Sequence, residues 1–194
     1  MKKLEKPASL KQRIYDIVKD DIISGGYDHG HVLNERSLSD ALGVSRTPIR
    51  EALKLLETEG WIEYVPYKGA IVRRMSPETL KEIFEIRNAL EVLSVGLAVQ
   101  RMTPEAIAGL KDFLAQQRQL VEAEQPPIAQ FINLDQDFHL TIARLSGNAL
   151  LVELIEKLRD KARAIGTHAL YAGNRRFLDT LAEHEEIILA LLSG

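Results

Sequence analysis

The chain has 194 residues, of which 45% are apolar and 27% charged, and it contains no cysteine. This composition is typical of a globular protein with one or two hydrophobic cores, and it excludes disordered and collagen-like classes. Without cysteine there is no disulfide framework and no thiolate nucleophile, which fits a reducing intracellular setting. Apolar runs are far shorter than the roughly 20 residues that span a bilayer. We therefore expect a cytoplasmic protein without a membrane anchor.

Charge is distributed unevenly along the chain. The net charge of -3 excludes an indiscriminate polyanion binder, so any nucleic-acid surface must be local. Residues 1–75 carry 13 Lys and Arg against 11 Asp and Glu, whereas residues 76–194 carry 12 against 17. Glycines and turn signals gather in the first part, and the second part has nearly unbroken helical periodicity. We therefore predict two domains, residues 1–75 and residues 76–194.

The first domain contains the spacing of a helix-turn-helix. Apolar residues at intervals of three and four predict a helix over residues 10–22. A short helix over residues 38–42 follows, then a turn at Gly43 and a second helix that Ser45 caps. Behind it, residues 61–65 and 70–73 alternate in polarity around a turn, which predicts a two-stranded wing.

Basic and hydroxyl side chains crowd the exposed start of that second helix. Arg46 and Arg50 can each reach a guanine with two hydrogen bonds, and Thr47 can hold a phosphate. Arg36 and Lys68 extend the same face. Solvated charges on a small helical bundle are the simple alternative, but cap, turn, basic face and wing occur together in the order that DNA recognition requires.

Two segments strengthen this interpretation: Asn34-Glu35-Arg36-Ser37-Leu38-Ser39 and Val44-Ser45-Arg46-Thr47-Pro48-Ile49-Arg50-Glu51-Ala52-Leu53. They resemble the winged helix of GntR-type bacterial transcription regulators, over about residues 8 to 75. The resemblance implies contacts with a double-stranded DNA operator from a set of exposed residues: Arg36, Ser45, Arg46, Thr47, Arg50 and Gly69. Because a single winged helix offers few base contacts, we expect a homodimer that reads two half-sites.

The second domain is predicted to be an all-helical bundle, so we expect the fold class of the chain to be mainly α. Its five predicted helices cover residues 77–101, 104–124, 127–145, 148–172 and 175–192, with breaks at proline or glycine. Four polar residues fall on the apolar faces of these helices: Arg87, Asp135, His139 and His184. Asp135 and His139 are four residues apart, the spacing at which a carboxylate and an imidazole can share a cation.

Charged groups that face a core must be compensated by one another, by a metal or by a charged ligand. A hydrogen-bonded core network is therefore one interpretation, and a metal site with Asp135, His139 and His184 is the other. Zinc is the first expectation from the ligand types, with nickel or manganese as alternatives. Arg87, and the stripe-edge residues Arg159 and Arg163, are candidates for binding a small carboxylate effector.

The motifs Asp135-Gln136-Asp137-Phe138-His139 and Glu183-His184-Glu185-Glu186-Ile187 resemble the two metal-ligand helices of the effector domain in FadR-like members of the same family. This resemblance implies Asp135, His139 and His184 as ligands and Arg87, near Glu91, as a carboxylate partner. The family pattern adds a last helix with one more histidine, which we expect to be missing from this chain. His168 is a weaker substitute, because it lies beside its apolar stripe.

These observations favour a transcription regulator whose operator binding is controlled by a metal-assisted small organic acid. The rival is a metal-dependent enzyme that uses Asp135, His139 and His184 to activate water. The sequence has no His-Glu-x-x-His motif, and an enzyme would leave the basic face of Arg46 and Arg50 unexplained. We therefore expect a protein that is not an enzyme.

Overall fold

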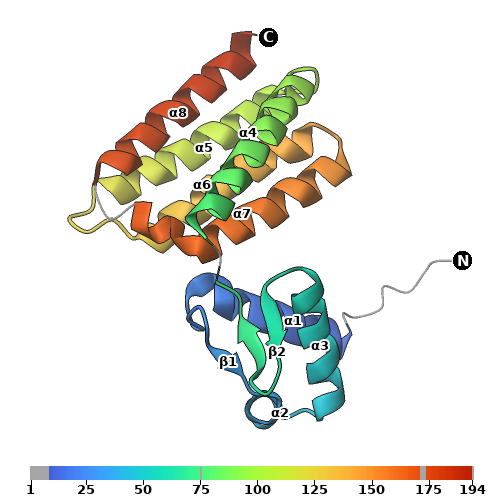
Figure 1. The fold of residues 1–194 in the computed structure, drawn as a ribbon. Helices are drawn as coiled ribbons and strands as arrows, with labels where there is room; N and C mark the ends of the chain where they lie inside the picture. Colours follow the sequence, from blue (N-terminus) through green and yellow to red (C-terminus); the bar gives the residue numbers. More distant parts are fainter. Residues whose placement is uncertain (1–8, 75, 171–173, 194) are drawn as a thin grey trace, which may run out of the picture. The chain divides into compact units, whose positions relative to one another are not determined.

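The computed structural model describes residues 9–74, 76–170 and 174–193, with the backbone alone for residues 165–170 and 174. The chain divides into two units, Met1–Ser76 and Pro77–Gly194 (Figure 1). The mainly helical class and the order of a winged helix before a helical bundle are confirmed.

The first unit is a winged helix-turn-helix. Its elements in chain order are α1 (Leu10–Ser24), β1 (Val32–Leu33), α2 (Glu35–Leu42), α3 (Arg46–Thr58), β2 (Ile62–Val65) and β3 (Gly69–Val72). The three strands form an antiparallel sheet in the order β1-β3-β2, in which Val32 pairs with Ile71 and Ile62 with Val72. Strand β1 was not predicted, because two residues are too short to show an alternating pattern.

The turn between α2 and α3 follows from its local sequence. The side chain of Asn34 accepts hydrogen bonds from the backbone of Arg36 and Ser37, which starts α2. Gly43 ends that helix at φ 66°, a left-handed conformation that favours glycine. Ser45 occupies the N-cap position of α3, as predicted, but its side chain makes no capping hydrogen bond there. Its hydroxyl therefore stays available to an outside partner.

The second unit is a bundle of helices that lie along one another (Figure 1). They are α4 (Pro77–Val99), α5 (Pro104–Val121), α6 (Ile128–Leu145), α7 (Ala149–Leu170) and α8 (Asn174–Ser193). Helix α6 packs against α4, α5 and α7, and α8 packs mainly against α5. One core joins residues of α5, α6 and α8, including Leu110, Phe131 and Phe177, and a smaller one joins α6 to α7. No helix among the described residues combines the length and apolar character needed to cross a membrane.

Candidate functional site

The predicted DNA-binding residues are all exposed on the first unit. Ser45, Arg46, Thr47 and Arg50 lie at or near the start of α3, Arg36 lies on α2, and Lys68 and Gly69 lie at the wing. A hollow of about 390 Å³ brings Arg36, Arg46, Lys68 and Gly69 together, whereas Ser45, Thr47 and Arg50 do not line it. The start of the recognition helix and the wing thus share one surface.

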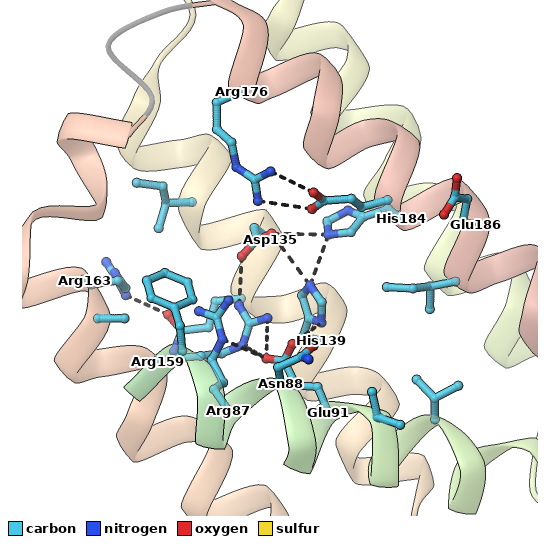
Figure 2. A pocket seen from close by; sticks show the side chains of 18 of the residues that line it. Arg87, Asn88, Glu91, Asp135, His139, Arg159, Arg163, Arg176, His184 and Glu186 are labelled. Atoms are coloured by element: carbon cyan, nitrogen blue, oxygen red, sulfur yellow. Dashed lines mark hydrogen bonds and ion pairs between the residues drawn. The ribbon is translucent and has the colours of Figure 1, made fainter. Parts of the chain in front are cut away.

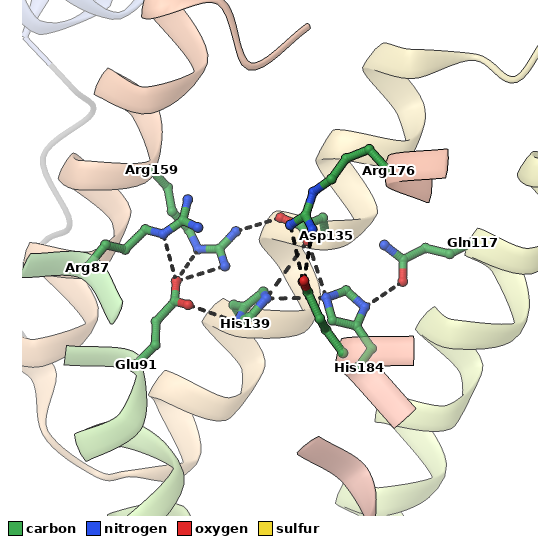
Figure 3. Close-up of polar contacts among 9 residues, drawn as sticks. Arg87, Glu91, Gln117, Asp135, His139, Arg159, Arg176 and His184 are labelled. Atoms are coloured by element: carbon green, nitrogen blue, oxygen red, sulfur yellow. Dashed lines mark hydrogen bonds and ion pairs between the residues drawn. The ribbon is translucent and has the colours of Figure 1, made fainter. Parts of the chain in front are cut away.

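The polar groups predicted to face the second core do meet (Figure 3). Asp135 and His139 come from α6 and His184 from α8. The Nε2 atom of His184 lies 3.2 Å from Nε2 of His139 and 3.2 Å from Oδ1 of Asp135, and the remaining side of this triangle is 3.8 Å. Ligand atoms around one tetrahedral or octahedral cation lie about 3 to 3.5 Å apart, since each is about 2.0–2.2 Å from the metal. Two of the three separations therefore match a shared divalent cation, and the third is about 0.3 Å longer than that range.

Two further side chains orient the imidazoles. Oε1 of Gln117, a fully buried residue of α5, lies 2.8 Å from Nδ1 of His184. Oε2 of Glu91, on α4, lies 3.3 Å from Nδ1 of His139. Both oxygens can accept from an Nδ1–H, and a neutral imidazole whose proton is on Nδ1 has its lone pair on Nε2. The ring of Phe138 stacks on His184 with centroids 4.0 Å apart and fixes its plane.

Arg159 holds the carboxylates of the cluster. Its side chain is only 3% exposed, and its guanidinium donates to Oδ2 of Asp135 at 2.8 Å and to Oε1 of Glu91 at 2.9 Å. Burial acts to raise the pKa of Asp135, but Arg159 and the neighbouring imidazoles outweigh it and hold that pKa well below its usual range. Burial, together with Arg159, holds the pKa of His139 well below its usual range. The cluster therefore contains a carboxylate and a neutral imidazole at neutral pH.

This cluster opens into a cavity of about 700 Å³ between α4, α6, α7 and α8 (Figure 2). Its lining combines charged side chains, which include Arg87, Arg163, Arg176 and Glu183, with apolar ones, which include Val92, Val95 and Ile187. Arg87 lies 3.4 Å from Glu91 and over the ring of Phe84, whereas Arg176 pairs with Glu183 at 2.8 Å. Arg163 donates to the neutral amide oxygen of Gln136 at 2.9 Å.

The structure corrects one detail of the sequence analysis and adds two residues to the site. Arg159 was placed at the edge of its stripe, but it is buried, because two carboxylates compensate its charge. Glu91 belongs to the cluster, since Arg87, His139 and Arg159 all contact it. Gln117 was missed, because one amide on an amphipathic helix gives no signal until a partner from another helix is known. The side chain of His168 lies outside the described residues.

A winged helix-turn-helix followed by a helical unit is an architecture of DNA-binding transcription regulators. Residues 10–72 match the model described as "Bacterial regulatory proteins, gntR family", and residues 82–194 match the FCD domain model. The chain belongs to the GntR family of bacterial transcription regulators and carries an FCD domain as its second unit. Its domains and relatives are those of regulators, so the enzyme alternative is set aside.

Characterised regulators resemble the chain over most of its length. It is 32% identical over 190 residues to the transcriptional regulator McbR of Escherichia coli (strain K12), covering 97% of this chain and 85% of that protein. It is 36% identical over 141 residues to the Nta operon transcriptional regulator of Aminobacter aminovorans, covering 73% of this chain and 66% of that protein. The solved structure of E. coli McbR/YncC superposes with a TM-score of 0.79 at 29% identity, covering 96% of this chain and 88% of that one.

Proposed function

We propose that operator binding by this regulator is controlled by a small carboxylic acid, bound in the second unit with the help of a divalent metal. The observation that supports this most strongly is the convergence of three potential metal-ligand atoms, Nε2 of His139, Nε2 of His184 and Oδ1 of Asp135, in the lining of the cavity. In the tautomer with both imidazole protons on Nδ1, three lone pairs face one another and repel, and a cation removes that repulsion.

Asp135, His139 and His184 would hold the metal, and zinc is the first expectation for a donor set of two imidazoles and a carboxylate. When bound, the cation supplies a positive charge and coordination positions that protein ligands leave open. Gln117 and Glu91 would keep both Nε2 atoms turned toward the metal, because each offers an oxygen to the opposite ring nitrogen, at 2.8 Å and 3.3 Å.

The acid is expected to lie between the metal and the cavity arginines. Among the described residues, Arg163 has no carboxylate partner, and its contact with Gln136 leaves its charge uncompensated. Arg87 shares Glu91 with Arg159 and keeps its guanidinium at the cavity wall. Arg159 is already paired with Asp135 and Glu91, so we assign it the role of holding those groups rather than the effector. The apolar wall would receive the carbon skeleton.

The regulator is further proposed to act as a homodimer on a pseudo-palindromic operator. Two winged helices on two half-sites double the base contacts that one α3 helix makes, which is how short recognition helices reach high affinity. An effector that binds one conformation of the second unit more tightly would then shift the population of DNA-competent dimers.

The alternative is a cluster whose polar groups form hydrogen bonds only with one another. If the amide of Gln117 turned round, or if His184 were protonated, Nε2 of His184 would donate to Asp135, and no metal would be needed. The chain would then be a DNA-binding regulator without a metal-assisted effector.

A thermal-shift assay of the full chain distinguishes a metal-assisted effector site from a cluster that needs no metal. We expect zinc to raise the melting temperature, and one or more members of a panel of two- to six-carbon acids to raise it further only when zinc is present. His139→Ala should abolish both effects, and His31→Ala, which removes an exposed imidazole of the first unit, should abolish neither. A parent chain that contains no metal by elemental analysis and ignores zinc, chelator and acids contradicts the proposal.

A further inference from the structure

One arginine of the recognition helix is tied to an acidic side chain. Nε of Arg50, on α3, donates to Oε2 of Glu35, the first residue of α2, at 2.7 Å. This is the only hydrogen bond that the Arg50 side chain makes in the described part of the chain, so Nη1 and Nη2 remain available. The side chain of Arg50 is 59% exposed and that of Glu35 is 29% exposed.

The other arginines of this face are not held in the same way. Arg46 makes no ion pair within the described ranges, and Arg36 has only a distant contact with Asp40, 3.9 Å away. The backbone of Glu35, in contrast, has a fixed position. The Asn34 cap sets the start of α2, and the buried side chain of Leu38 anchors this helix in the core. The carboxylate therefore has a defined position from which to orient Arg50.

A carboxylate on a DNA-facing surface weakens binding to every sequence, since it repels phosphates. Because Glu35 lowers the general affinity for DNA, we expect it to improve another property of binding through Arg50. A free arginine can turn to whichever phosphate is nearest, which adds affinity without sequence information. An arginine whose Nε is occupied presents Nη1 and Nη2, two parallel donors that match O6 and N7 of guanine.

We propose that Glu35 is a positioning residue that makes Arg50 read a guanine instead of a phosphate. The carboxylate lowers affinity for DNA in general and raises the difference between the operator and other sequences. The Glu35–Arg50 pair, rather than Arg50 alone, is then the unit that determines specificity at one position of each half-site.

Selection from a randomised double-stranded DNA library, with the full chain as bait, tests this. The parent should enrich a motif that contains a guanine, and Arg50→Ala should lose that position. Glu35→Gln should lose the same position, bind a scrambled duplex a few-fold more tightly, and show a ratio of selected to scrambled affinity about tenfold lower than the parent. Glu51→Gln removes the same charge from α3 and should keep the motif.

The double variant Glu35→Gln/Arg50→Ala should discriminate no worse than Arg50→Ala, because Glu35 acts only through Arg50. A purely structural role would instead lower the melting temperature of Glu35→Gln and leave the selected motif unchanged. The proposal is overturned if Glu35→Gln keeps the full motif, if the two losses add, or if the parent enriches no motif at all.

Discussion

At the scale of single residues, the proposed metal site of the second unit would depend on side chains that are not ligands themselves. Gln117 and Glu91 lie beside Nδ1 of His184 and of His139, where each can hold a proton on that nitrogen. Outer partners of metal-bound imidazoles are worth about 10- to 100-fold in metal affinity. Their contribution can be tested separately from that of the ligands.

Gln117→Leu should lower zinc affinity about 10- to 100-fold without abolishing binding, because His184 then loses the acceptor that selects its tautomer. Competition with a chromogenic chelator measures this affinity. Gln116→Leu is the matched control, since Gln116 is an exposed neighbour that contacts Asp112. Equal affinities for both variants would show that Gln117 does not orient the ring.

The sequence was sufficient to predict that the side chains of Asp135, His139 and His184 turn inward, because apolar residues surround them at helical spacing. It was not sufficient for Gln117 or for the burial of Arg159. The positions of Gln117 and Arg159 are explained only by partners on other helices. Periodicity within one helix carries no information about such partners.

At the scale of elements, the wing has an unusual turn. The backbone N–H of Lys68 donates to the carbonyl of Val65 at 3.0 Å, and Tyr67 within this turn has φ 64°. Its side chain is fully exposed, so no packing offsets the left-handed backbone. The strands of the wing were predictable from alternation and the turn residues, but the strain at Tyr67 was not, because the sequence places a tyrosine where glycine or asparagine is usual.

Tyr67→Gly should raise the free energy of unfolding by about 0.5 kcal/mol, since relief of about 1 kcal/mol of left-handed strain exceeds the added entropy of the unfolded chain. Urea denaturation of the parent and the variant checks this. Tyr67→Ala keeps the strain and removes the same ring, so it should show no gain. A gain of equal size in both variants would attribute the effect to the ring and not to the backbone.

At the scale of the whole molecule, the two units carry different optical signals. Trp61 is the sole tryptophan of the chain, and it is buried in the first unit. The helices α4 to α8 make up most of the helical residues and therefore dominate the far-ultraviolet circular dichroism. The two units can thus be followed separately in one sample.

If the proposed metal is bound, its removal should lower the melting temperature seen by circular dichroism and leave the fluorescence transition of Trp61 in place, because the three proposed ligands belong to the second unit only. His139→Ala should melt like the chelated parent by both probes. Movement of both transitions together would contradict independent unfolding and show that the units melt as one.

The guanidinium of Arg159, fixed between α4 and α6 by two carboxylates, has a kinetic consequence. Asp135 is already held by Arg159, His139 by Glu91 and His184 by Gln117, so each donor has its direction before any cation arrives. Binding then requires little rearrangement, and the rate should be set by water exchange on the incoming ion rather than by folding of the protein. The proposed site would therefore fill quickly when the supply of metal rises, and the same preorganisation would slow the release of the bound ion.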